Sequence, residues 1–106
     1  MQIQIRHDEN VRGDKNGWIA QTVEDVLSRY GEQITTVEVH LADEDGPKNS
    51  DGAIRATVEA RPAGFGPIAA TAHGDDVGTA LEAALAKVAR MLDGTLGRVR
   101  DHHANL

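Results

Sequence analysis

The chain of 106 residues contains no cysteine, which excludes disulfide bonds and thiolate zinc sites. A domain of this length buries roughly two-thirds of its unfolded surface, which is enough for one hydrophobic core without cross-links. The chain is also too short for two ordinary domains. Because a cysteine-free chain suits a reducing compartment, we expect a single soluble domain in the cytoplasm.

Long apolar runs are absent as well. Residues 1–6 alternate apolar and polar side chains, and they contain no apolar stretch of signal-peptide length. No segment approaches the roughly 20 apolar residues that a membrane-spanning helix needs. We therefore expect no membrane partner.

Positive charge is scarce, with 11 Lys and Arg residues against 17 Asp and Glu, a formal net charge of −6. The imbalance is uneven along the chain. Residues 1–76 hold 7 basic and 14 acidic side chains, whereas residues 77–106 hold 4 basic and 3 acidic ones. An acidic chain is repelled by nucleic acid at long range, so any phosphate-binding surface must concentrate its cations. The end of the chain is where the sequence does so.

Hydrophobic periodicity predicts a strand followed by a helix in the first third of the chain. Residues 2–6 show the period-two pattern of a half-buried strand. Apolar side chains then recur every three or four residues over 18–30, which is typical of one helix face. Asp14 or Asn16 can cap the start of this helix, and Gly31 suits the left-handed conformation that ends many helices.

Three strands are expected next. Alternating apolar side chains occur over 37–41, 54–61 and 68–73. Residues 43–52 are rich in Asp, Glu, Gly, Pro, Asn and Ser, which predicts a long hairpin loop. The connection over 62–67 contains two prolines and two glycines and predicts a tighter turn.

The last predicted element is a long helix. An apolar stripe runs from Val77 to Val99, and Asp75 or Asp76 can cap its start. Gly94 and Gly97 cost about 1 kcal/mol each relative to alanine, so the final turns are expected to fray or bend.

The element order predicts an α+β fold in two layers, β-α-β-β-β-α. The economical packing places both helices on one face of a four-stranded mixed sheet, as in double-stranded-RNA-binding domains, and leaves the other face open to water. This open face is expected to be polar. Its predicted residues are Gln2, Gln4, Arg6, Glu38, His40, Arg55, Thr57, Glu59, Arg61, Thr71 and His73.

Nothing in the sequence predicts an enzyme. Ser28 and Ser50 lie in no nucleophile motif, and residues 74–78 suit a turn and helix cap better than a phosphate-binding loop. His40, His73 and Glu59 share the open face and could hold a metal ion, but ordinary solvent-facing polar residues explain them better. We expect no metal, no cofactor and no small-molecule substrate.

The candidate functional residues are basic side chains that can meet nucleic-acid phosphate. Charges on an outer face often do no more than solvate it, and this alternative remains open. Stacking on bases is not expected, because Trp18, Tyr30 and Phe65 are the only aromatic residues and none lies on the open face. The candidates are Lys87, Arg90, Arg98 and Arg100 near the end of the chain, with Arg55 and Arg61 on the open face.

Short segments in order along the whole chain carry a family resemblance. They are MQIQI at 1–5, ITTVEVHLADE at 34–44, EAR at 59–61, Gly64, PI at 67–68 and LGRVRD at 96–101. Together they resemble the HPF/RaiA family of bacterial ribosome-associated, hibernation-promoting translation inhibitors. The resemblance implies one ribosome-binding domain over residues 1–101, of the same β-α-β-β-β-α order, followed by a disordered tail at 102–106.

The resemblance also implies a partner and a mode of action. Family members dock on the small ribosomal subunit near the decoding region and block transfer RNA and messenger RNA in slow growth or stress. Lys87 and Arg90 fall on basic positions of the family's last helix, while Arg98 and Arg100 match its basic C-terminal turns. The first helix departs from the family, since Glu24 stands where related members carry more lysines.

A second hypothesis is a diverged adaptor that binds a protein through its acidic loops or its open sheet face. The net charge of −6 motivates it. The oligomeric state is left open by the sequence. This chain also ends about where the shared domain ends, and long family members continue into a dimerisation domain.

Overall fold

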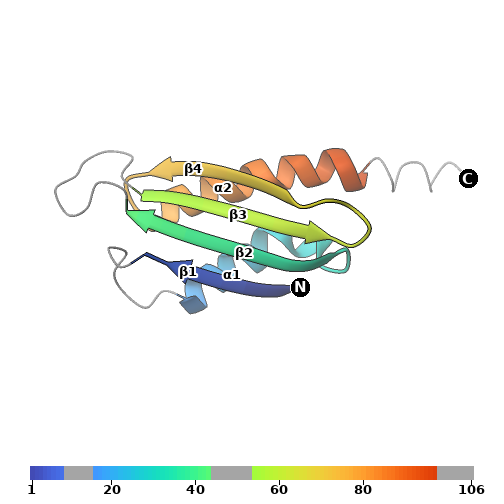
Figure 1. Ribbon diagram of the computed structural model, residues 1–106, viewed down its shortest axis with the longest axis horizontal. Helices are drawn as coiled ribbons and strands as arrows, with labels where there is room; N and C mark the ends of the chain where they lie inside the picture. The colour runs from blue at the N-terminus through green and yellow to red at the C-terminus, as the bar shows by residue number, and fades with distance from the viewer. Residues whose placement is uncertain (9–15, 44–53, 98–106) are drawn as a thin grey trace, which may run out of the picture.

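A four-stranded sheet covered on one face by two helices forms the molecule (Figure 1). The computed structural model describes residues 1–8, 16–43 and 54–97. The elements in chain order are β1 (Gln2–His7), α1 (Asn16–Leu27), the 3₁₀ turn η1 (Ser28–Tyr30), β2 (Ile34–Asp43), β3 (Ile54–Pro62), β4 (Ile68–Gly74), α2 (Val77–Leu92) and the π-helical turn η3 (Asp93–Gly97). The predicted α+β fold and its β-α-β-β-β-α order are confirmed.

The sheet is mixed, as expected. Its strands lie in the order β1-β2-β3-β4; β1 is parallel to β2, and the other two pairs are antiparallel. A parallel pair needs a crossover connection, and α1 provides it behind the sheet (Figure 1). Because α1 carries the chain back across the sheet, β2 can run in the same direction as β1.

The core lies between the sheet and the helices. Because side chains alternate along a strand, β2 sends Val37, Val39 and Leu41 to the helices, and all three are fully buried. The helices contribute apolar stripes with a spacing of three or four residues. These are Ile19, Val23 and Leu27 from α1, and Val77, Ala80, Leu81, Ala84, Leu85, Val88 and Leu92 from α2.

The two helices run in the same direction behind the sheet (Figure 1). Near their N-terminal ends the Trp18 ring lies so close to Gly78 that a β-carbon there would be 3.1 Å from it. Near their C-terminal ends Arg29 Nη2 donates to Asp93 Oδ1 at 2.7 Å. Contacts at both ends hold α1 alongside α2.

Three apolar side chains predicted for the helix cores are exposed instead. Trp18 is 47% exposed, Val26 37% and Met91 43%. Each lies next to a residue of the buried stripe, and one step along a helix turns a side chain by about 100° away from it. The predicted apolar stripes, which were drawn from spacings of three and four residues, therefore included side chains at the edge of each buried face.

The ends of the helices differ in how well the sequence predicted them. Asp76 caps α2 by accepting a bond from the Thr79 backbone N–H at 2.7 Å, as predicted. Asn16 is the first residue of α1 and not its cap, and its Oδ1 lies 2.7 Å from His7 Nε2. The left-handed prediction for Gly31 is wrong, because it has φ −56° and continues from the turn η1.

The helix α2 passes into the wider π-helical turn η3 over the segment where the sequence predicted fraying or bending. Leu96 remains buried at the end of the stripe. All four strands extend past the predicted ranges. The strand β2 begins at Ile34 and ends at Asp43, and β1, β3 and β4 each continue one residue further, to His7, Pro62 and Gly74. Most of the predicted loop at 43–52, the cap candidate Asp14, Val99 and the tail at 102–106 lie outside the described residues.

No helix in the described ranges is long and apolar enough to cross a bilayer. This finding concerns residues 1–8, 16–43 and 54–97 alone.

The junction of β4 and α2 supplies a stability test. A β-carbon on Gly74 would lie 2.7 Å from the Ala80 backbone nitrogen and 2.9 Å from Thr79 Cβ. Since a helix backbone cannot give way as a flexible side chain can, Gly74→Ala should lower the free energy of unfolding by about 1–3 kcal/mol. Urea denaturation measures the change.

Gly17→Ala in α1 is the matched control, because a β-carbon there has nothing within 4 Å. It should leave stability unchanged or raise it by up to about 1 kcal/mol. Equal stability of the two variants would contradict the close approach at Gly74.

Candidate nucleic-acid interface

Two of the predicted phosphate-binding residues lie on α2. Lys87 is exposed, yet its ammonium reaches sideways and donates to the backbone carbonyl of Thr71 on β4 at 2.9 Å. Arg90 is exposed in the last turn of the helix. It has no ion-pair partner within the described part of the chain, so its guanidinium can meet a phosphate without breaking an internal ion pair. The two cations are neighbours on the helix, because residues three apart share a face.

The open sheet face carries the other two described candidates. Arg55 and Arg61 lie on β3 among side chains that point away from the helices. Arg61 Nη2 donates to Glu59 Oε1 at 2.8 Å, and Arg55 is half-buried opposite His73 of β4. The structure adds Arg6 of β1 to this surface, 4.0 Å from Glu38 Oε1. Arg6 was expected on this face but was not among the candidate residues.

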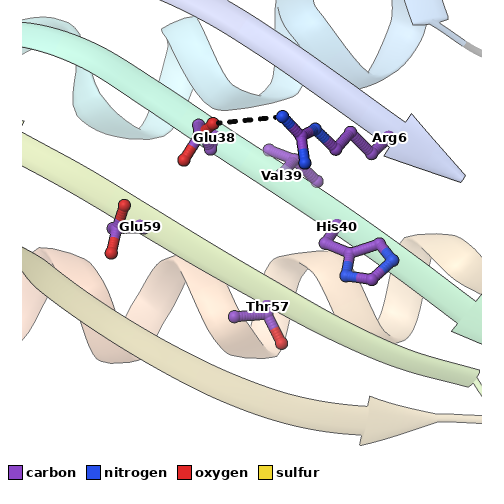
Figure 2. Close-up of a pocket in the computed structure, with 6 residues that line it drawn as sticks. All are labelled: Arg6, Glu38, Val39, His40, Thr57 and Glu59. Carbon is purple, nitrogen blue, oxygen red and sulfur yellow. Dashed lines mark ion pairs between the residues drawn. The ribbon is translucent and has the colours of Figure 1, made fainter.

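A shallow hollow of about 220 Å³ lies on the open face between β1, β2 and β3. Figure 2 shows Arg6 and Glu38 on one side of it and Thr57 and Glu59, from β3, on the other. Small-molecule sites usually enclose about 300–1,000 Å³ and are largely apolar. This hollow is smaller, and all but one of its lining residues are polar or charged, which suits one projecting group of a larger partner. Its lining residues are Arg6, Glu38, Val39, His40, Thr57 and Glu59.

The strand register explains the charge pattern around the hollow. Glu38 of β2 stands directly opposite Glu59 of β3, and like charges in this position repel one another. Arg6 and Arg61 approach the two glutamates from the next rows of the sheet and partly neutralise them. Acidic and basic side chains therefore alternate along the face.

The three residues considered for a metal site are not brought together. His40 Nε2 lies 3.0 Å from Asp8 Oδ1, a contact possible because β1 runs parallel to β2. His73 pairs in register with Arg55, two rows away from Glu59. Within residues 1–8, 16–43 and 54–97, no three His, Cys, Asp or Glu side chains form a group that could hold a metal ion.

The two layers carry similar charge among the described residues. The open face carries three arginines (Arg6, Arg55 and Arg61) against Glu38, Glu59 and Asp8, whose carboxylate lies beside His40. The elements α1, η1, α2 and η3 together carry four acidic and three basic side chains. Positive charge is thus found on the sheet face as well as on α2. The remaining candidates, Arg98 and Arg100, lie outside the described residues.

Several solved structures are similar to this chain, among them the following two. One is a ribosomal subunit interface protein from Coxiella burnetii, with a TM-score of 0.67 and 17% identity, covering 92% of this chain and 99% of that one. The other is the N-terminal domain of Thermus thermophilus Protein Y, with a TM-score of 0.65 and 18% identity, covering 90% and 99%. No family model and no curated protein sequence matches the chain. The likeness supports the HPF/RaiA-like fold that the resemblance implied.

The opposed glutamates give a test of the register. Glu38→Gln removes one of two facing carboxylates and sacrifices only a 4.0 Å contact with Arg6. It should raise the free energy of unfolding by about 0.2–1 kcal/mol in low salt. The gain should shrink at high salt, where exposed charges are screened. Urea denaturation at two ionic strengths measures it.

Glu24→Gln on the exposed surface of α1 makes the same change in net charge away from the sheet. A gain as large in this control would assign the effect to net charge alone. A loss of stability in Glu38→Gln would contradict the repulsion.

Proposed function

We propose that this protein is a ribosome-associated translation inhibitor that binds ribosomal RNA of the small subunit near the decoding region. The observation that carries the proposal is the fold match over nine-tenths of the chain to a protein described as a ribosomal subunit interface protein. The ordered family resemblance read from the sequence supports the same conclusion. Binding there would block transfer RNA and messenger RNA by occupying their space, in slow growth or stress, without any chemical step.

The distribution of cations suits RNA backbone recognition. The arginine guanidinium presents a planar set of N–H donors that matches phosphate oxygens. Its bond to phosphate contributes most where no carboxylate within the protein already pairs with it. Arg90 on α2 is exposed and unpaired within the described ranges, while Arg61 shares its charge with Glu59. Arg90 is therefore expected to contribute more to binding than Arg61. Arg55, Lys87, Arg98 and Arg100 complete the proposed set.

The aromatic side chains indicate which kind of RNA contact to expect. Trp18 and Phe65 are exposed, but Trp18 lies on α1 and Phe65 lies in the turn between β3 and β4. The face with the arginines carries no aromatic platform among the described residues. Recognition without base stacking rests on phosphate and shape, so it should depend little on sequence and strongly on salt.

Co-sedimentation with purified small subunits across a salt series tests the proposal. Removing one cation that binds a phosphate should reduce the slope of log affinity against log salt by about 0.7–0.9. We expect this reduction for Arg90→Gln, and a smaller one for Arg61→Gln because of its pairing with Glu59. Replacing Lys87, Arg90, Arg98 and Arg100 together should abolish binding.

Arg29→Gln is the matched control, since it removes one positive charge from a residue that pairs with Asp93 and lies over the Tyr30 ring. It should leave the slope unchanged. No ribosome-bound protein even at low salt would rule out the proposal. Recovery of one protein partner without ribosomal RNA would favour the adaptor hypothesis instead.

A further inference from the structure

The two edges of the sheet are protected to different degrees. At the β4 edge, the Lys87 ammonium donates a hydrogen bond to the backbone carbonyl of Thr71. A lysine across an edge strand hinders the approach of another strand. At the β1 edge, no strand of the described residues pairs with the outer side of Gln2–His7. In Figure 1 β1 forms the border of the sheet opposite β4.

The composition of β1 offers little protection against strand pairing. Natural edge strands are commonly interrupted by proline, lysine or a bulge, and β1 has none of these. Its apolar side chains are also incompletely covered. Ile3 and Ile5 are only half-buried, whereas Val37 and Val39, their register partners on β2, are fully buried. Among the described residues, this edge therefore leaves backbone groups without a strand partner and apolar surface only partly covered.

We propose that β1 is a self-association edge, at which a second copy of this chain pairs antiparallel through its own β1. A two-fold axis normal to the sheet would pass beside Gln4. Gln4 then faces Gln4 of the second copy, Ile3 faces Ile5, and Gln2 faces Arg6. The two sheets join into one of eight strands, with both open faces on the same side.

This register is self-complementary in charge and in shape. Arg6, whose side chain is 75% exposed, meets the amide of Gln2 and not another arginine. The facing Gln4 amides each offer a donor and an acceptor. Each half-exposed isoleucine covers an isoleucine of the other copy, which is the kind of cross-strand pair that stabilises sheets.

Other registers satisfy fewer of these groups. A shift by one residue would place the isoleucines opposite polar side chains on the wrong face of the sheet. A shift by two would set Ile3 against His7 and leave fewer isoleucine pairs. A single-strand interface is small, so the dimer should be weak and depend on protein concentration. This inference does not rest on the proposed ribosome binding.

Sedimentation equilibrium over a wide concentration range tests the association. The wild-type chain should show reversible dimerisation. Gln4→Lys puts two ammonium groups face to face at the axis and should raise the dissociation constant about tenfold or more. Gln2→Glu, which would face Arg6, should lower it. Ala69→Lys is the control, because it adds the same charge to the exposed face of β4.

Because the chain has no cysteine, single-cysteine variants test the register directly. Directly opposed residues of antiparallel strands have Cα atoms about 4.5–5.5 Å apart, within the reach of a disulfide. Gln4→Cys should form a covalent dimer under mild oxidant much faster than Ala69→Cys. A chain that stays monomeric at high concentration, or equal crosslinking of both variants, would overturn the proposal.

Discussion

The parallel pairing of β1 with β2 determines most of what is distinctive in this structure. A parallel neighbour cannot be reached by a hairpin, so the chain crosses behind the sheet and forms α1 on the way. That crossing places α1 on one face, where the apolar stripe of α2 also packs, and the other face is left to water. It also places β1 at the border of the sheet and aligns Arg6 with His40, which forms one side of the hollow.

The elements themselves were largely predictable from local pattern, and the exceptions have physical causes. Period-two alternation placed Arg55, Glu59 and Arg61 on the open face because successive strand residues must point to opposite sides. The edges of the buried helix faces were harder to predict. A spacing of three or four residues fits the exposed Trp18 and Met91 as well as it fits the buried residues beside them. Gly31 shows that a glycine after a helix need not adopt a positive φ, because a 3₁₀ turn can continue the chain with right-handed angles.

The candidate surface was predictable in composition but not in geometry. The sequence indicates that Lys87 is exposed, but its contact with Thr71 depends on how α2 lies across β4. The opposition of Glu38 and Glu59 depends on the register between β2 and β3, which a long connection separates. The pairing of His40 with Asp8 likewise needs the parallel alignment of strands 32 residues apart in sequence. Pairings across such distances are set by packing, and periodicity does not specify them.

The single tryptophan lies where α1 meets α2, with its ring against Gly78 and about half of its surface in water. Its fluorescence should therefore be sensitive to the separation of the two helices, which would expose the rest of the ring and shift emission to longer wavelength. The protein thus contains an intrinsic optical reporter of helix docking. The sheet face with its arginines lies on the other side of the molecule, so a ligand bound there would leave this signal free of direct quenching.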